Sequence, residues 1–249
     1  MRIKFIIPFP FDDEGIANRA AQMPADLLGP DTKVECIPVR NSATLVDCYY
    51  EDLVFDMYIT EAGLRAEEEG YDAVIMDTVS DSGLWALRSR LSIPVIGPGL
   101  VSYVVGIMLG KRFSIITMWD KWAHLYEKNL ALYDLKQKCA SVRAVNIPPD
   151  VEALFTGKED EMFQRLTEEG RRAIEEDGAD VLLLGSTTMH QAGAYMGEHL
   201  PVPVINPGPV AIKMAETLVQ LGLSHSKVAF PSPSSIIDDR YFSLAGAGA

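Results

Sequence analysis

Two stretches of this sequence occur twice at nearly the same spacing, and this repeat constrains the fold more than any other feature. The segment EEEG at residues 67–70 returns as EEDG at residues 175–178, 108 positions later (175 − 67). The segment IPVIGPG at residues 93–99 returns as VPVINPG at residues 202–208, 109 positions later (202 − 93). Any α/β chain repeats the lengths of its strands and helices, but that does not produce matched sequences at nearly one offset. We therefore interpret the chain as an internal duplication.

Short apolar runs alternate with longer periodic segments in both halves of the chain, which is typical of strands that alternate with helices. We predict strands at residues 3–8, 33–38, 72–77 and 93–96, then at 112–118, 141–147, 180–185 and 202–205, and a last one at 227–230. We predict helices at residues 15–28, 47–69, 83–91 and 101–109, then at 121–135, 159–177, 188–199 and 210–221. This alternation predicts an α/β protein with parallel sheets whose faces are covered by helices.

Charge and composition narrow the class of function. The 249 residues are 48% hydrophobic and 23% charged, which is a globular balance. The net charge of −13 would repel nucleic-acid phosphates and anionic membranes, so we expect neither as a partner. The apolar runs are shorter than the ~18 residues of a membrane span, and the first is too short for a signal peptide. Three widely spaced cysteines predict no metal site and no disulfide framework, and we expect a cytoplasmic protein without a cofactor.

Small polar residues follow two predicted strands that the repeat makes equivalent. The third strand runs into DTVSDSG at residues 77–83, and its repeat partner runs into GSTTMH at residues 185–190. The offset of 108 pairs Thr78 with Ser186. Ligands of open α/β sheets bind beyond the carboxyl ends of the strands, and both segments open helices, whose N-termini favour anions. We predict that both segments face one small-molecule site; the alternative is that their side chains only cap helices.

At these two segments the chain resembles the aspartate/glutamate/hydantoin racemase superfamily, and within it the hydantoin racemase branch. In that branch the first motif reads roughly Cys-Phe-x-Asp-Pro-Gly-Leu, and residues 78–84 here read TVSDSGL. The second motif reads roughly Leu-Gly-Cys-Ala-Gly-Met, and residues 184–189 here read LGSTTM. Residues 93–97 and 112–117 also look like that branch, so the resemblance covers nearly the whole chain.

The resemblance implies two α/β lobes related by a pseudo-twofold axis. Each lobe would be doubly wound around a mainly parallel sheet of four to five strands, with the active site in the cleft between the lobes. The first lobe would comprise residues 1–110 and 209–249, because the last strand is expected to return to it, and the second lobe residues 111–208. We also expect the protein to form a homo-oligomer.

The two catalytic residues of the family are cysteines, and this chain lacks both. In the family, one cysteine removes a proton from a carbon next to a carbonyl, and the other returns a proton to the opposite face. The matching positions hold Thr78 and Ser186, whereas Cys36, Cys48 and Cys139 lie in neither motif. A thiol, with a pKa of ~8.5, is readily tuned to a thiolate, but an alcohol is a far weaker acid and cannot be a resting base. We therefore predict that the two hydroxyls bind or polarise the substrate.

Other side chains could move protons. His190 lies four residues after Ser186, so the two would share a face if a helix began near Ser186. From there His190 could act as a general base on that hydroxyl or directly on the substrate. Asp81 lies three residues after Thr78 and Asp77 directly before it, and one of these two aspartates could orient a hydroxyl or serve as the base. The alternatives are a surface or packing histidine and a helix-capping aspartate.

The substrate is expected to contact both motifs and the loop after the first strand. In that loop the family often carries an Asn-Pro-Asn-type turn, and the phenylalanines found here would make the wall more apolar. The expected ligand is a small carboxylate or carbonyl compound, held from both sides by oxyanion-type donors. The expected substrate-binding residues are Pro8, Phe9, Ser80, Ser82, Thr117, Thr187, Thr188 and Asn206.

Three functions stay open at this point. The first is an isomerase- or racemase-like enzyme that acts next to a carbonyl of a small carboxylate or cyclic amide, without the two-cysteine mechanism. The second is a decarboxylase, or a hydrolytic enzyme that opens rings or cleaves C–C bonds, using Ser186, Thr78 and His190. The third is a two-lobed protein that binds a small anion without turning it over. The polar residues kept in both motifs favour an enzyme.

Overall fold

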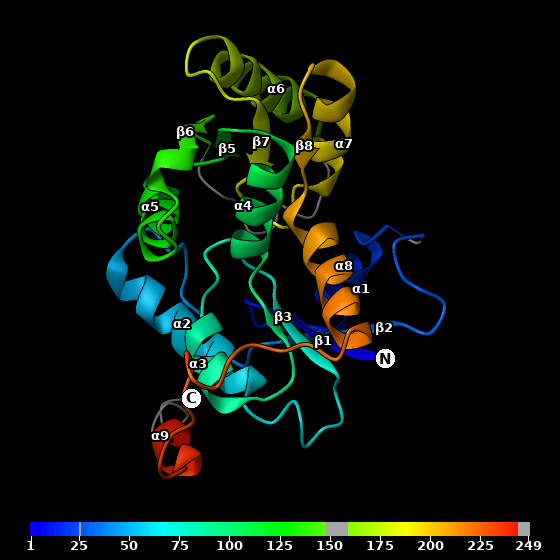
Figure 1. Ribbon diagram of the computed structural model, residues 1–249, viewed down its shortest axis with the longest axis vertical. Coiled ribbons are helices and arrows are strands. Elements are labelled where there is room, and N and C mark those ends of the chain that lie inside the picture. The colour runs from blue at the N-terminus through cyan, green and yellow to red at the C-terminus, as the bar shows by residue number, and fades with distance from the viewer. Residues whose placement is uncertain (25, 148–158, 244–249) are drawn as a thin grey trace.

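The computed structural model describes residues 1–24, 26–147 and 159–243, and these residues form two parallel sheets of four strands each (Figure 1). The first sheet has the order β2-β1-β3-β4 and the second the order β6-β5-β7-β8, so the second repeats the first. This confirms the predicted α/β fold with two lobes. The strands are β1 (Arg2–Ile7), β2 (Lys33–Pro38), β3 (Ala73–Met76) and β4 (Val95–Ile96), then β5 (Phe113–Thr117), β6 (Cys139–Ala144), β7 (Val181–Leu184) and β8 (Val204–Ile205).

Strand register gives the correspondence between the two sheets residue by residue. Ile6 of β1 lies opposite Met76 of β3, and Ile116 of β5 lies opposite Leu184 of β7. Position 76 therefore corresponds to 184, an offset of 108 (184 − 76), and position 6 corresponds to 116, an offset of 110 (116 − 6). The offset of 108 is the one found in the sequence.

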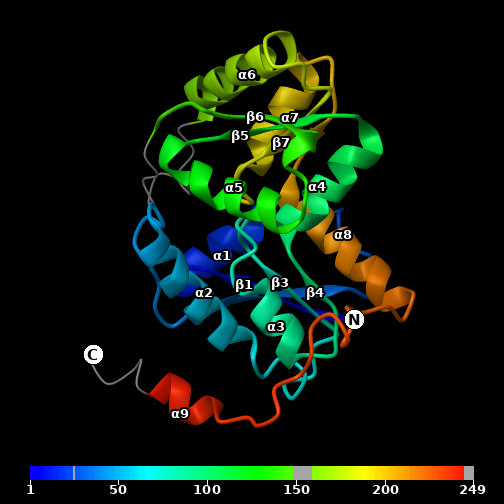
Figure 2. The same cartoon turned by 60° about the vertical axis from the view of Figure 1, so that its left-hand side comes forward.

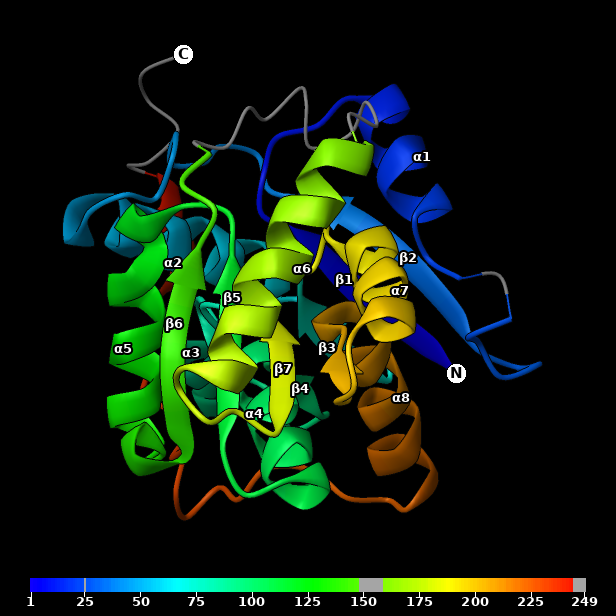
Figure 3. The same cartoon turned by 90° about the horizontal axis from the view of Figure 1, so that it is seen from above.

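Each sheet is covered by helices on both faces. On the first sheet, α2 (Tyr49–Gly63) and α3 (Leu84–Arg90) cover one face, while α1 (Asp13–Ala21) and α8 (Pro207–Gln220) cover the other. On the second sheet, α6 (Glu159–Glu175) and α7 (His190–His199) cover one face, as Figure 3 shows, and α4 (Pro98–Leu109) and α5 (Ala123–Leu132) cover the other. Apolar strand residues are thus buried on both faces, as parallel sheets require.

Two of these helices are exchanged between the lobes. Helix α4 follows β4 of the first sheet but packs on β5 and β7, where Tyr103 stacks on Phe113 with 5.5 Å between ring centroids. Helix α8 follows β8 of the second sheet but packs on β3 and β4, and its Ile212 joins the core around Ile75. Figure 2 shows α4 and α8 side by side where the lobes meet. We propose that the first lobe comprises residues 1–110 and 209–249 and the second lobe residues 111–208. By this division α4 belongs to the first lobe but packs on the sheet of the second.

The predicted last strand is wrong, because residues 227–230 form a turn. Val228 is 94% exposed there, so no apolar side chain anchors a strand. Side chains attach this segment to the end of α3 instead. His225 Nε2 lies 2.8 Å from the carbonyl of Leu91, and Lys227 Nζ donates to the carbonyl of Arg88 at 2.7 Å. These carbonyls lie at a helix C-terminus, where they lack intrahelical partners.

Several helix ends also differ from the predictions. Helix α1 ends at Ala21 rather than at residue 28, shortly before Pro24, and α2 ends at Gly63 rather than at residue 69. Helix α7 begins at His190, not at residue 188. The remaining short elements are η1 (Asp120–Trp122), η2 (Lys136–Lys138) and α9 (Asp238–Ser243), which lies far from the second lobe in Figure 1.

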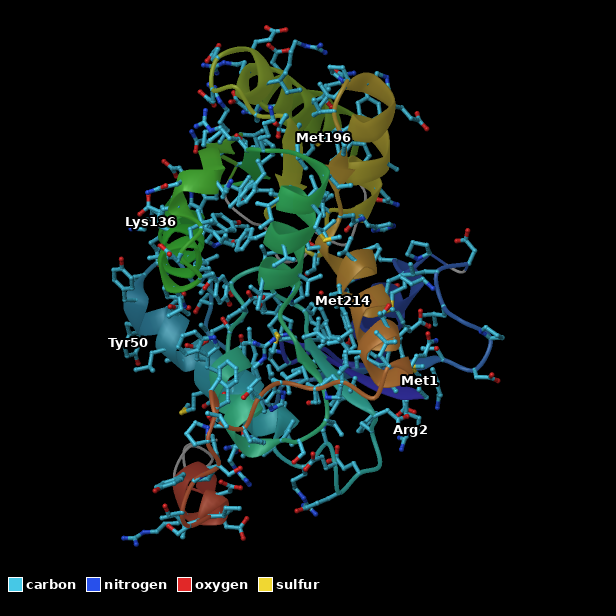
Figure 4. The ribbon with its side chains drawn as sticks, in the orientation of Figure 1. Met1, Arg2, Tyr50, Lys136, Met196 and Met214 are labelled. Carbon is cyan, nitrogen blue, oxygen red and sulfur yellow. The ribbon has the colours of Figure 1, made fainter. Side chains whose placement is uncertain are left out.

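The start of α2 carries an exposed aromatic pair. Tyr49 and Tyr50 are 72% and 76% exposed, and Figure 4 shows Tyr50 at the outer end of the helix. The pair is therefore not part of the core. Among the described helices, none is long and apolar enough to cross a membrane.

Candidate active site

The first polar turn follows directly from the buried strand β3. Residues 77–83 reverse the chain before α3, with Asp81 at φ 54° and Gly83 at φ 75°. Both values lie in the left-handed region, which glycine adopts without cost and aspartate tolerates better than most residues. The Thr78 hydroxyl accepts a hydrogen bond from the Ser82 amide at 3.3 Å, and the hydroxyls of Ser80 and Ser82 lie 2.8 Å apart. The turn thus presents buried hydroxyls at the carboxyl end of the first sheet.

The second polar turn occupies the equivalent place after β7. The hydroxyls of Ser186 and Thr188 lie 2.9 Å apart, and the Thr188 amide donates to the Ser186 hydroxyl at 3.3 Å. In both turns, therefore, the hydroxyl of the first motif residue, Thr78 or Ser186, accepts a hydrogen bond from a backbone amide of the same turn. Residue 187 belongs to this turn and reaches the other one, because the Thr187 hydroxyl donates to the Asp77 carbonyl at 3.2 Å.

The two turns open onto one cavity of about 100 Å³. A cavity of this size exceeds the space of a single water molecule and suits a small ligand. Its polar side chains are those of Thr44, Asp77, Thr78, Ser80, Tyr126, Ser186, Thr187 and Thr188. Its apolar part includes Ile7, Pro8, Phe9, Phe11, Val46, Phe55, Trp122 and Leu125. Seven of the residues expected from the sequence therefore line one cavity, namely Pro8, Phe9, Thr78, Ser80, Ser186, Thr187 and Thr188.

The cavity carries little charge. Of the described residues that line it, Asp77 is the only one with a carboxylate, and Arg19 binds both of its oxygens, at 2.6 and 2.8 Å. Both side chains are almost fully buried, so this ion pair is shielded from solvent. Burial raises the pKa of the Tyr126 phenol, which stays protonated and contacts the Gly185 carbonyl at 2.7 Å. The polar part of the cavity is therefore made of neutral hydroxyl groups and one neutralised carboxylate.

A loop of the first lobe completes the wall, and a residue of the second lobe holds it. The indole N–H of Trp122 donates to the Leu45 carbonyl at 2.8 Å. Val46, which has φ 54°, is fixed by Glu51, whose carboxylate accepts the amides of both Leu45 and Val46. A β-branched residue rarely adopts this φ, so the surroundings must hold it there. The sequence predictions missed this loop, since it contains no motif.

Asp81 lies outside the cavity. Its carboxylate accepts the amides of Gly99 and Leu100 at the start of α4, at 2.8 and 2.7 Å, and the hydroxyl of Tyr133 at 2.8 Å. Burial raises the pKa of Asp81 to about 6, against the lowering effect of these hydrogen bonds. The structure thus places Asp81 as a cap of α4 that also joins the second lobe, which is the alternative considered for it.

His190 also lies away from the cavity. Helix α7 begins at His190, so Ser186 precedes the helix and the two residues do not share a helical face. The imidazole borders a separate space of about 10 Å³, enough for about one water molecule. Burial, followed by the positive charge of Arg19, lowers the pKa of His190. His190 is therefore a neutral histidine that lies behind the second turn.

Three expected substrate-binding residues lie behind the cavity rather than in its lining. The Ser82 hydroxyl contacts Ser80, and the Thr117 hydroxyl lies 2.8 Å from the Tyr126 hydroxyl. Asn206 precedes α8, and its Oδ1 is buried. Ser82 and Thr117 thus each contact a residue that lines the cavity.

Thiols are absent from the described lining of the cavity. Burial raises the pKa of Cys36 and of Cys139 to about 11, the opposite of an activated thiol, and Cys48 is exposed and lies outside the cavity lining. No group of three or more potential metal ligands occurs in the part of the chain that the structure describes. The chemistry available at the cavity is therefore hydrogen bonding by hydroxyls and amides.

Both the sequence and the structure of this chain are similar to those of racemases. A sequence model of the Asp/Glu/hydantoin racemase family matches residues 16–215. A hydantoin racemase from Pseudomonas sp. (strain NS671) is 29% identical over 198 residues, 80% of this chain and 78% of that protein. A hydantoin racemase from Rhizobium meliloti is 32% identical over 165 residues, 66% of this chain and 67% of that protein. An allantoin racemase structure from Klebsiella pneumoniae superimposes with a TM-score of 0.83 at 28% identity, covering 95% of this chain and 96% of that one.

Proposed function

Because this chain belongs to the Asp/Glu/hydantoin racemase family, we propose that it is an enzyme that acts on the carbon next to a carbonyl of a small cyclic amide or carboxylate. The observation that carries the proposal is the meeting of the Thr78 and Ser186 turns at one cavity. Relatives named hydantoin racemase and allantoin racemase support the choice of substrate chemistry.

We propose that the reaction does not use the two-cysteine mechanism. Chemistry next to a carbonyl passes through a carbanion whose charge resides largely on the carbonyl oxygen, and hydrogen-bond donors aimed at that oxygen stabilise it. The hydroxyls of Thr78 and Ser186 supply such donors from opposite sides. In the described chain, the amides of Val79, Ser80 and Thr187 donate to no protein acceptor, so they are available as well.

Whether a compound reacts then depends on how acidic its own C–H bond next to the carbonyl is. Since Arg19 occupies both oxygens of Asp77, the described lining offers no strong base. Substrates whose C–H bond is already acidic, such as hydantoins with an aromatic substituent, fit this site best. The apolar wall of Phe9, Phe55 and Trp122 would hold that substituent. The expected reaction is transfer of the proton on that carbon to a water molecule in the cavity, with the negative charge left on the carbonyl oxygen. A solvent proton then returns to either face of the carbon, which isomerises the substrate.

Decarboxylation is a second candidate, and the same missing base favours it. Loss of CO2 from a malonate or 3-oxo acid forms the carbanion without removal of a proton. An apolar wall would also destabilise the departing carboxylate by displacing its water. The hydroxyl donors of the two turns would serve this carbanion equally well.

One experiment separates these reactions. The purified protein is incubated in deuterated buffer with 5-phenylhydantoin, 2-phenylmalonate and a 3-oxo acid, and each is followed by NMR against a sample without protein. Deuterium at the 5-position of the hydantoin supports isomerisation, while CO2 release supports decarboxylation. Opening of the hydantoin ring would indicate a hydrolase. No turnover of any compound, together with micromolar binding, would contradict the enzyme and support a binding protein.

A further inference from the structure

Two buried residues occupy equivalent positions in the two lobes although their side chains differ. Strand register relates β1 to β5 by an offset of 110, and the helices that follow keep it, since α1 begins at Asp13 and α5 at Ala123 (123 − 13). Arg19 in α1 therefore corresponds to Asn129 in α5 (129 − 19). Only 3% of Arg19 and 1% of Asn129 is exposed.

Arg19 reaches from the first lobe to the turn of the second. Its guanidinium binds the Asp77 carboxylate and also donates to the Thr187 carbonyl at 3.3 Å. Asp77 directly precedes Thr78, and Thr187 directly follows Ser186. One guanidinium thus contacts the chain neighbour of each hydroxyl.

Asn129 makes the reciprocal contact. Its side-chain amide reaches from the second lobe to the turn of the first and donates to the Val79 carbonyl at 3.2 Å. Val79 directly follows Thr78, and the offset of 108 makes Val79 the equivalent of Thr187 (187 − 79). Each lobe therefore donates, from the same helical position, to the same carbonyl of the other lobe's turn.

We propose that Arg19 and Asn129 are a crossed pair of positioning residues that set the placement of the Thr78 and Ser186 turns relative to each other. This inference rests on the proposed function, since the turns must face one substrate from two sides. Buried carbonyl groups keep a partner because leaving one unpaired is unfavourable, so each donor fixes its turn. Catalysis depends steeply on such placement, and a shift of about 1 Å can lower the rate by ~100-fold.

The first measurement compares kinetic constants on whichever of the three compounds the wild-type protein turns over. Asn129→Leu removes the donor at similar volume. Arg19→Lys keeps a positive charge beside Asp77, but its single ammonium cannot make the forked contact with Asp77 and also reach the Thr187 carbonyl. Each variant is expected to lower kcat by ~10- to 100-fold while KM changes much less. Thr167→Val is the matched control, because it removes a buried hydroxyl that donates to the Phe163 carbonyl at 2.7 Å within α6.

The second measurement needs no substrate. Amide hydrogen exchange is followed by mass spectrometry in peptides that cover residues 77–83 and 185–190 of the unliganded protein. Asn129→Leu is expected to speed exchange in residues 77–83, in the other lobe, and Arg19→Lys in residues 185–190. Thr167→Val should leave both segments unchanged, even if it lowers the melting temperature equally.

The two measurements together decide the inference. Unchanged exchange in the opposite turn would overturn it, whatever the activity. Faster exchange with an unchanged kcat would reduce both residues to a structural role and would overturn it too. If the wild-type protein turns over none of the compounds, the proposed function fails instead, and exchange alone still decides whether Arg19 and Asn129 hold the turns.

Discussion

At the scale of single residues, the main feature is the pair of hydroxyls at Thr78 and Ser186, the two positions where the sequence motifs lead us to expect the family's catalytic cysteines. Thr78 and Ser186 line the same cavity, and each accepts a hydrogen bond from a backbone amide of its own turn. The Thr78 hydroxyl proton can therefore point at a ligand, and so can the Ser186 hydroxyl proton when Thr188 is the donor in the contact between those two hydroxyls. The arrangement favours donation to a developing negative charge over removal of a proton.

Removal of either hydroxyl should therefore slow the reaction without preventing folding. We expect Thr78→Val and Ser186→Ala each to lower kcat by ~100-fold, since one donor to a developing oxyanion contributes about that much. Steady-state kinetics on the compound that wild-type protein turns over checks this. Ser114→Ala is the control, because it removes a buried hydroxyl 2.8 Å from that of Ser141, away from the cavity. Wild-type rates in both cavity variants would rule out the proposed role.

Asp81 should make stability depend on pH in an unusual direction. Its folded-state pKa of about 6 lies above the ordinary 3.8, so the folded protein holds a proton that the unfolded chain releases between these values. The contribution of protonated Asp81 is fully present below pH ~3.8 and is lost as the pH rises through 6, by about 3 kcal/mol in total. Urea unfolding of wild type and Asp81→Asn between pH 4.5 and 7.5 measures it. The advantage of wild type over the variant should shrink as the pH rises; a growing advantage would contradict it.

The sequence predicted the place of the two turns better than the direction of their side chains. That the turns meet follows from a rule about strand ends, which depends only on the order of strands. The orientations of Asp81 and His190 depend on local backbone geometry that residue spacing does not reveal. A left-handed φ at Asp81 turns its carboxylate toward α4, and a late start of α7 separates His190 from Ser186.

At the scale of elements, close packing at one glycine decides how α2 sits on the first lobe. A Cβ atom on Gly63 would lie 2.6 and 2.8 Å from the two Cδ atoms of Leu87 and 3.2 Å from Cδ1 of Ile6. Both neighbours are fully buried, so they have little room to move. The contact between α2 and α3 therefore requires glycine at this position.

Two Gly→Ala substitutions should thus have opposite effects on stability. Gly63→Ala is expected to lower the free energy of unfolding by about 1–3 kcal/mol through overpacking. Gly197→Ala lies in the exposed part of α7, with no atom within 4 Å of the new Cβ, and should raise the free energy of unfolding by about 0.5–1 kcal/mol. Urea unfolding curves provide both values. A rise in the free energy of unfolding for Gly63→Ala as well would show that helix propensity, not packing, dominates at Gly63.

Element types could be predicted from the sequence because apolar runs and periodic segments alternate clearly. The eight strands of the two sheets match predicted ones, but residues 227–230 were wrongly predicted as a ninth. Their apolar residues resemble a strand, yet no sheet edge receives them, and polar contacts to α3 decide their path. A short apolar run predicts a strand only when tertiary structure offers it a neighbour.

At the scale of the whole molecule, the lobes are joined too extensively to act as separate units. Helices α4 and α8 each complete the core of the lobe that they do not follow in sequence. Buried polar contacts add to this, including Asp81 to Tyr133 and Asn129 to Val79. The exchange of helices could not be predicted from the sequence, because both helices are apolar enough to pack on either sheet.

We therefore expect one cooperative thermal transition for the whole chain. Calorimetry should give equal calorimetric and van't Hoff enthalpies, because neither sheet keeps both faces covered when the lobes part. Tyr133→Phe, which removes the contact to Asp81, should lower the melting temperature without splitting the transition. Two resolved transitions, one for each lobe, would contradict this view of the molecule.

The crossed contacts of Arg19 and Asn129 also affect how this chain can diverge. Residues 19 and 187 are 168 positions apart, and residues 79 and 129 are 50 apart, yet each pair shares a hydrogen bond. A chimaera could take one half from this chain and the other half from a relative. The turn of each half would then contact a helix from the other protein, α1 or α5. Such a chimaera could fold and still lose activity, even when both parents are active. We therefore expect substitutions at these contacts to preserve activity only when both halves change together.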